Sequence, residues 1–311
     1  MQIFAKTTTI DFMGKRRFTA IFSAVLILVG IVSLFSRGLN LGIDFTGGVL
    51  LEVGYTTPAD LSDIRARLEG GGFDSAMVQN FGTATDVLIR VLPEPDVDSA
   101  QVGDDILALL AAGDSDVELR RAEFVGPQVG KELTEKGGLA MLFAVIMILI
   151  YIMIRFQWKF AVGSVIALLH DVLITIGVFS VFQFPFDLSV LAAILAVIGY
   201  SLNDTIVVFD RIRENFRLIR QQGAEAIMNT SINQMLGRTV ITSLTTLFVL
   251  FSLLFFGGEA VRGFSLALII GILIGTYSSI YTASASALAL DVTTDDLMPP
   301  KVDKEAVDDL P

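Results

Sequence analysis

Six stretches of mostly apolar residues constrain the fold of this 311-residue chain more than any other feature. The first runs from Phe18 to Ser36, and at about 1.5 Å per residue it nearly spans a hydrocarbon core of about 30 Å. The other five follow Gly138, at Leu139–Ile154, Phe160–Phe182, Leu188–Phe209, Val240–Phe256 and Gly263–Leu290. Soluble cores do not contain five such runs in succession. The sequence therefore predicts an α-helical polytopic membrane protein with six transmembrane helices.

The first stretch has a second interpretation, because basic residues followed by an apolar run are also typical of a secretory signal peptide. Lys15, Arg16 and Arg17 precede this stretch, and Arg37 follows it. The run is longer than the apolar core of a typical signal peptide, and residues 33–37 make a poor cleavage site. We therefore expect a retained membrane anchor after a cytoplasmic N-terminus of residues 1–17.

The composition excludes several classes of site. Charged residues make up 18% of the chain, against about 25% in soluble proteins. There is no cysteine and only one histidine, His170, so disulfides, thiolate metal sites and His-rich metal centres are excluded. Residues 37–138 contain 18 acidic and 8 basic side chains. Without clustered Lys and Arg, the chain is not expected to bind nucleic acid.

The loops between the predicted spans indicate orientation, because short cytoplasmic loops are enriched in Lys and Arg. Arg155 and Lys159 lie between spans two and three, and Arg262 is alone between spans five and six. The segment between spans four and five contains five arginines, Arg211, Arg213, Arg217, Arg220 and Arg238. We expect both termini in the cytoplasm and residues 37–138 in the periplasm.

The outer segment, residues 37–138, is predicted to form a small α+β domain followed by a connector. Strand-like patterns lie at Val49–Tyr55, Ala76–Phe81, Asp86–Leu92 and Val117–Phe124, and helical patterns at Pro58–Leu68 and Val102–Ala112. Glycines follow both helical patterns, as is common at helix ends. The order β-α-β-β-α-β is typical of a ferredoxin-like domain.

Two cytoplasmic segments have weaker patterns. Residues 211–237 mix apolar residues with basic and amide residues, which predicts an amphipathic connector along the membrane surface between spans four and five of the 139–290 bundle. A solvated linker with one apolar side is an equal alternative. The acidic tail, residues 291–311, is predicted to be disordered.

Two carboxylates fall within predicted spans. Asp171 lies beside His170 in span three, and Asp204 follows Ser201 and Asn203 in span four. A charge at such a depth costs at least about 2.5 kcal/mol, so its presence requires a reason. One reason is ion translocation, with Ser201, Asn203 and His170 as supporting polar groups. The other is a neutral carboxyl that joins helices through hydrogen bonds.

Arg238, at the predicted start of span five, is a candidate partner for Asp204. Span four enters from outside at Leu188, so Asp204 lies about 24 Å along it, in the cytoplasmic third of the membrane. Burial favours the neutral acid, whereas an approaching guanidinium favours the carboxylate. The pair therefore has the chemistry of a proton switch. The alternative for Arg238 is an interfacial anchor.

The sequence contains no motif of a soluble enzyme, neither a phosphate-binding loop nor a metalloprotease or serine-hydrolase motif. The hydroxyl residues of the last span alternate with alanines and are typical of a close-packed helix face: Thr276, Ser278, Ser279, Thr282, Ser284 and Ser286. We therefore expect no enzymatic activity, and any energy input must come from an ion gradient or a partner.

Four motifs resemble the SecD/SecF family of protein-export membrane proteins, which is similar to resistance-nodulation-division transporters. They are GIDFTGG at 42–48, His170-Asp171, the twenty-residue block Ala196–Asn215, and the run 233–239. Taken alone, the first is also a glycine-rich turn between span one and the first strand. The resemblance covers nearly the whole chain. It implies that Gly42, Asp44, Gly47 and Gly48 form a family motif, and that Asp204 and Arg238 belong to an ion path.

The resemblance also implies a function in protein export across the bacterial inner membrane. The implied partners are SecD in a heterodimer, the SecYEG channel, the accessory proteins YajC and YidC, and an unfolded preprotein at the periplasmic domain. After the ATP-driven step of SecA, the pair would use the proton gradient, or sodium in some lineages, to complete translocation. No cofactor is implied. A second carboxylate of the ion path belongs to SecD, so this chain would hold half of the path.

Two other classes of protein are compatible with six spans. An exporter of small lipophilic molecules would normally need larger outer domains than one of about 100 residues. A non-conducting assembly factor would have no ion path and would tolerate the substitution Asp204→Asn.

Overall fold

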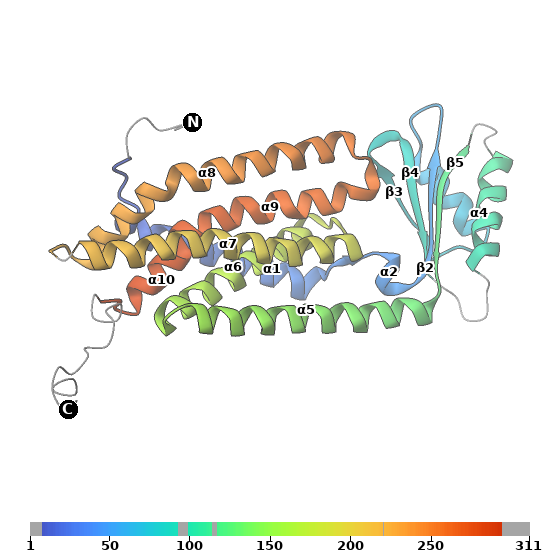
Figure 1. The fold of residues 1–311 in the computed structure, drawn as a ribbon. Helices are drawn as coiled ribbons and strands as arrows, with labels where there is room; N and C mark the ends of the chain where they lie inside the picture. The colour runs from blue at the N-terminus through green and yellow to red at the C-terminus, as the bar shows by residue number, and fades with distance from the viewer. Residues whose placement is uncertain (1–7, 93–98, 114–116, 220, 294–311) are drawn as a thin grey trace.

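The computed structural model describes residues 8–92, 99–113, 117–219 and 221–293. Within these residues six helical segments are long and apolar enough to cross a membrane, in agreement with the sequence. Five are the single helices α1 (Arg16–Arg37), α5 (Pro127–Arg155), α6 (Trp158–Phe182), α7 (Leu188–Leu218) and α8 (Ala224–Phe256). The sixth is composite, with α9 (Arg262–Ser278), a π-helical turn (Ser279–Ala283) and α10 (Ser284–Ala289). They form one bundle with a sheet-containing domain at one end (Figure 1).

The six spans are not equally buried. Half or more of the apolar windows of α6, α7 and the composite sixth span is buried, against 6% for α5. Helix α1 packs closely on α6 because Gly30 and Gly177 meet, and a Cβ atom on Gly177 would lie 2.7 Å from the Cα of Gly30. Small residues permit such an approach of two membrane helices. The central helices therefore form the interior, while α5 is left at the periphery.

The segment between spans four and five differs from the prediction. Residues 211–218 continue α7 without a break, and residues 224–237 are the first part of α8. The predicted connector at 211–237 is therefore divided between the ends of two long helices, which extend beyond their apolar parts as a helical hairpin. Span two also extends further than predicted, since α5 begins at Pro127 rather than at Leu139.

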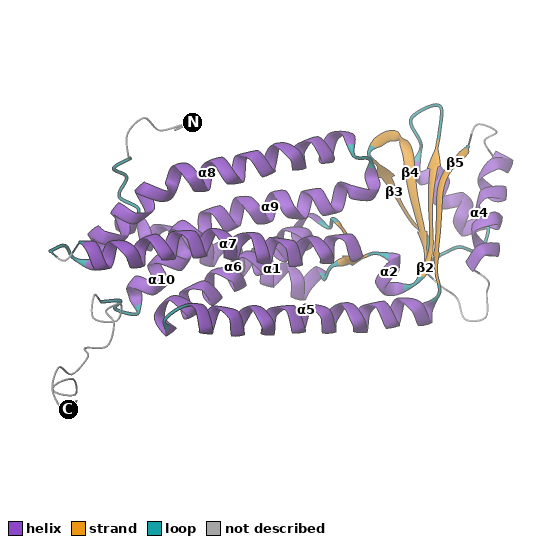
Figure 2. Cartoon of the chain, in the orientation of Figure 1, coloured by secondary structure: helices purple, strands orange, loops and turns teal. Residues whose placement is uncertain are grey.

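The outer domain has the predicted α+β order. Its strands are β2 (Gly48–Gly54), β3 (Met77–Phe81), β4 (Thr83–Val91) and β5 (Glu118–Val125), and its helices are α3 (Leu61–Gly70) and α4 (Ser99–Gly113). The sheet is antiparallel with the order β3-β4-β2-β5, which is the ferredoxin-like arrangement. Helix α4 covers the face of the sheet that is turned away from the bundle (Figure 2). A separate core of Val, Ile and Leu side chains lies between the sheet and its helices.

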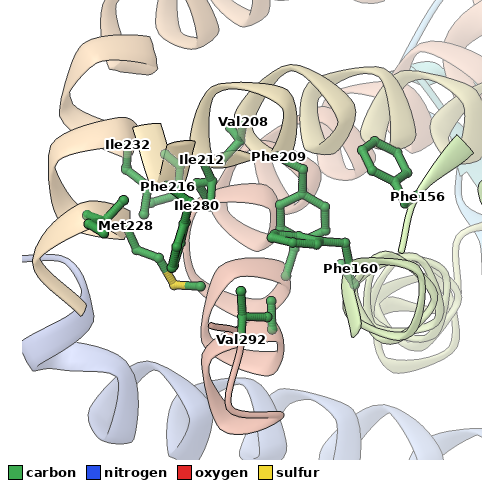
Figure 3. Close-up of a cluster of buried hydrophobic side chains, with 14 of the residues drawn as sticks. Phe156, Phe160, Val208, Phe209, Ile212, Phe216, Met228, Ile232, Ile280 and Val292 are labelled. Carbon is green, nitrogen blue, oxygen red and sulfur yellow. The ribbon is translucent and has the colours of Figure 1, made fainter. Parts of the chain in front are cut away.

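A large hydrophobic cluster fills the end of the bundle opposite the outer domain. Figure 3 shows aromatic and aliphatic side chains of α6, α7, α8 and the sixth span converging there, among them Phe160, Phe209 and Ile280. Phe160 and Phe209 pack edge to face, with ring centroids 4.9 Å apart. The buried side chains of Phe12 and Met13, which precede α1, belong to the same cluster.

Two asparagines of α8 hold the segment that precedes α1. Asn233 accepts from the backbone N–H of Ile10 at 2.9 Å and donates to the Ile10 carbonyl at 2.8 Å. Asn229 accepts from the backbone N–H groups of Phe12 and Met13, both at 2.9 Å. These bonds satisfy backbone groups before and at the start of a short 3₁₀ helix, Met13–Lys15. Residues 1–7 and the predicted disordered tail beyond residue 293 lie outside the described residues.

Candidate functional site

Asp204 lies on α7 and is buried, with 6% of its surface exposed. Its Oδ2 accepts a hydrogen bond from Ser279 Oγ at 3.0 Å. Ser279 is the first residue of the π-helical turn in the sixth span. The buried hydroxyl of Thr239 lies near this carboxylate without the geometry of a hydrogen bond. Asp204 thus has a buried but incompletely bonded environment.

Arg238 lies on α8, near enough to Asp204 to act on it electrostatically. Its side chain is exposed, and no ion pair joins it to Asp204 in the described part of the chain. Arg238 is also not at the start of a helix, because α8 begins at Ala224. The structure therefore brings the two predicted residues into the same region but leaves them unpaired.

Asp171 lies on α6 and is almost completely buried, with 1% of its surface exposed. Its Oδ2 accepts hydrogen bonds from Ser201 of α7 and from Ser278 of α9, the latter at 2.7 Å. Its Oδ1 lies 2.8 Å from Nδ1 of His170. Three side chains from three helices therefore surround this carboxylate.

His170 extends this network to α1. Its Nε2 lies 2.9 Å from Ser23 Oγ, which in turn lies 3.1 Å from the hydroxyl of Tyr277. The Tyr277 hydroxyl donates to the backbone carbonyl of Thr19 at 2.8 Å. Both ring nitrogens of His170 are thus satisfied. His170 and Asp171 are adjacent in the sequence, and the structure shows that their side chains are also in contact.

Two neighbouring serines, Ser278 and Ser279, bind the two carboxylates. Successive residues of a helix point about 100° apart, so adjacent side chains reach different neighbouring helices. Ser278 reaches Asp171 and Ser279 reaches Asp204. The hydroxyl pattern of the last span predicts only close packing, so the sequence does not indicate that Ser278 and Ser279 bind the carboxylates. Their position at the start of a π-helical turn was not visible in the sequence, and such turns occur frequently at functional sites.

Asn203 does not belong to this site. It is exposed, although Ser201 and Asp204 of the same helix are buried. Its expected supporting role is therefore not seen in the described bundle, because its position on α7 turns it away from both carboxylates.

The glycine-rich motif lies apart from the carboxylates, at the junction of the bundle and the outer domain. Residues 43–46 form the single helical turn α2 (Ile43–Thr46), and Gly47 and Gly48 follow with φ angles of 72° and 118°. A Cβ atom on Gly48 would lie 2.3 Å from the carbonyl oxygen of Val91. Asp44 Oδ2 accepts from the backbone N–H of Leu188, the first residue of α7, at 3.0 Å. The contacts of the motif therefore join the outer domain to the bundle.

No group of three or more His, Cys, Asp or Glu side chains suited to a metal ion was found in the residues that the structure describes. The interior of the bundle contains two buried carboxylates, one imidazole and several hydroxyl groups. The fold and site thus define a polytopic membrane protein with one α+β domain and a polar, titratable interior.

Comparison with known proteins identifies the family. Residues 105–293 match the family described as protein export membrane protein SecD/SecF, C-terminal, and residues 32–59 match the SecD/SecF GG motif. The chain belongs to the SecD/SecF family of protein-export membrane proteins. Its membership and its six apolar helices make it a multi-pass protein of the bacterial inner membrane.

Curated relatives carry the name protein translocase subunit SecF. The relative from Vibrio alginolyticus is 51% identical over 308 residues, which cover 99% of this chain and 98% of that protein. The relative from Pseudomonas aeruginosa is 49% identical, with 98% and 99% covered. A crystal structure of SecDF from Thermus thermophilus, a translocon-associated membrane protein, matches 93% of this chain with a TM-score of 0.83 and 36% identity. This chain spans 40% of the length of that SecDF chain.

Proposed function

We propose that this chain is an accessory subunit of the Sec protein-export machinery that uses the proton gradient to help complete preprotein translocation. The membership of the SecD/SecF family and the translocase-subunit relatives support the role in export. The chain itself performs no enzymatic reaction. Its contribution is to convert proton movement into motion of the outer domain.

The observation that carries this proposal is the environment of Asp204. A buried apolar site favours the neutral acid, and a nearby cation favours the carboxylate. Asp204 is buried, is incompletely hydrogen-bonded, and lies near an unpaired Arg238. A small approach of α8 to α7 would pair the two and release a proton, whereas separation would favour proton uptake. Alternation between these two states is the coupling step.

Asp171 and His170 have a different role in this proposal. The network that links Asp171 to Ser23 and Tyr277 contains only groups that donate and accept protons. Such a chain can transfer a proton along hydrogen bonds that are already formed. Asp171 is therefore a relay or store next to the switch at Asp204.

The direction of coupling follows from topology. We propose that both termini and the α7–α8 hairpin lie in the cytoplasm, because Arg155, Lys159 and the arginines at 211–238 gather at that end. The outer domain then lies in the periplasm. Protons entering from that side must pass the carboxylates before they reach the cytoplasm.

The partners follow from the length of the chain and from its surface. The relative SecDF is a longer chain, of which this one spans 40%, and a SecD subunit would supply the remaining part and a second carboxylate. The weakly buried helices α1, α5 and α8 offer apolar surface to that subunit or to lipid. The SecYEG channel, with YajC and YidC, would complete the assembly, and unfolded preprotein would contact the acidic outer domain.

The substitution Asp204→Asn tests the proposal, because it keeps the side-chain volume and removes titration. Inverted inner-membrane vesicles with the variant as the only copy should lose the export that an imposed proton gradient stimulates, at normal abundance of the protein. Asp210→Asn is the matched control, since Asp210 lies on the same helix in ion pairs with Arg155 and Arg213. Replacing the proton gradient by a sodium gradient in the same vesicles distinguishes the two ions.

Normal gradient-stimulated export with Asp204→Asn would contradict a role in ion coupling and would favour the non-conducting assembly factor. Loss of the protein from the membrane would show a structural role instead. Efflux of a lipophilic dye that depends on Asp204, with unaltered protein export, would favour the small-molecule exporter.

A further inference from the structure

The loop between α1 and the outer domain is attached to the start of α7 by backbone and side-chain contacts. The short strands β1 (Asn40–Leu41) and β6 (Pro185–Phe186) pair in parallel. Gly42 N–H donates to the Phe186 carbonyl at 2.8 Å. We call this contact between residues 40–48 and 185–188 the joint.

The joint continues directly into the outer domain. After the single turn α2, the chain enters β2, the strand that pairs with both β4 and β5 at the centre of the sheet. The turn itself is closed by Gly47 N–H, which donates to the Ile43 carbonyl at 2.7 Å. Helix α5 packs on the same turn, since a Cβ atom on Gly130 would lie 2.8 Å from Gly47 N. Motion of the joint must therefore move the sheet.

The joint also continues directly into the carboxylate site. Asp204 lies on α7, sixteen residues after Leu188, with no interruption of the helix between them. An α-helix transmits displacement along its axis because its backbone hydrogen bonds join every turn. A shift of α7 at Asp204 therefore reaches the joint about 24 Å away.

Asp44 provides a side-chain link between the outer domain and α7 at this point. Its carboxylate accepts from the N–H of Leu188, one of the backbone donors that a helix start leaves unsatisfied. Asp187 already caps α7 from within its own segment, with Val190 N–H donating to Asp187 Oδ1 at 2.8 Å. Helix α7 therefore does not need Asp44 in order to begin. The bond of Asp44 instead attaches the outer domain to the helix.

We propose that Asp44 is a positioning residue that couples α7 to the outer domain, so that changes in the charge of Asp204 move that domain. This inference rests on the proposed function. In the glycine-rich motif, the glycines would allow the backbone to pack closely against α5 and β4. The Asp44 carboxylate would attach the motif to the start of α7.

The test compares three variants of the whole chain in inverted inner-membrane vesicles that contain its partners. Asp44→Ala removes the acceptor, and Asp44→Asn keeps an oxygen that can accept from Leu188 N–H. Asp60→Ala is the control, because Asp60 caps α3 inside the outer domain, by accepting from the N–H groups of Ser62 and Asp63. Two quantities are measured, the export stimulated by a proton gradient and the infrared carbonyl band of protonated Asp204, assigned by its absence in Asp204→Asn.

Asp44→Ala should lower gradient-stimulated export about tenfold, since a hydrogen bond to a charged group shifts an equilibrium by roughly that factor. The Asp204 band should still respond to the gradient. Asp44→Asn should recover most of the export, and Asp60→Ala should leave it unchanged. Normal export with Asp44→Ala, or loss of the Asp204 response together with export, would overturn the inference. If Asp204→Asn itself exports normally, the proposed function fails as well.

Discussion

Asp171 and Asp204 lie on neighbouring helices of one bundle, but their surroundings differ. Asp171 accepts hydrogen bonds from Ser201 and Ser278 and contacts His170, whereas Asp204 accepts one from Ser279 and lies near an unpaired arginine. Hydrogen bonds to a carboxylate favour its charged form, so a carboxylate with fewer of them depends more on whether a cation approaches or withdraws. The comparison therefore assigns a relay held in one position to Asp171 and the switch to Asp204.

The largest expected effect is a difference in protein stability between variants of Asp171 and variants of Asp204. Asp171→Ala removes three hydrogen-bond contacts with buried side chains, and at about 1 kcal/mol for each it should cost about 3 kcal/mol. Asp204→Ala should cost about 1 kcal/mol, the value of one bond. Thermal unfolding in detergent, followed by the fluorescence of the single tryptophan, Trp158, measures both. Equal losses for the two variants would remove the proposed difference.

The two adjacent serines provide a smaller and more selective comparison. Ser278→Ala should destabilise the protein by about 0.6–1.7 kcal/mol, the range for hydrogen bonds between membrane helices, with little effect on ion coupling. Ser279→Ala should change stability little and reduce ion coupling, because it removes the hydrogen bond that Asp204 accepts. Unfolding temperature and gradient-stimulated export are measured for both variants. If both serine variants change only the unfolding temperature, or only gradient-stimulated export, the proposed difference between Asp171 and Asp204 is wrong.

The sequence predicted the architecture but only part of this site. Six apolar runs and a β-α-β-β-α-β pattern define the spans and the domain, because hydrophobic length and periodicity are local properties. The helical hairpin was missed since α7 and α8 leave the apolar region without a helix-breaking signal. The partners of Asp204 depend on which way each residue points around its helix. Asn203 is adjacent to Asp204 in the sequence but is exposed, whereas Ser279, 75 residues after Asp204, donates a hydrogen bond to it.

The smallest expected effect uses an exposed carboxylate as a reference. The N–H of Gly14, and then the side chain of Asn229, lower the pKa of Asp11. A lowered pKa in the folded state means that the bond stabilises above the unfolded pKa of about 3.9 and is lost as the pH falls through the folded value. Asp11→Ala should therefore lower the unfolding temperature slightly at pH 7, and this difference should shrink as the pH falls below about 3.9. A difference that increases on acidification would contradict this assignment.

The central claim is that Asp204 gains and loses a proton when the gradient changes, and infrared difference spectroscopy tests it most directly. Vesicles containing the whole chain and its partner are recorded while the pH on the periplasmic side is changed. The account predicts a carbonyl band of a protonated carboxylic acid that appears in the wild-type protein and in Asp210→Asn, and is absent in Asp204→Asn. A band that persists in Asp204→Asn, or a wild-type spectrum with no carboxyl change during gradient-driven export, would contradict the account.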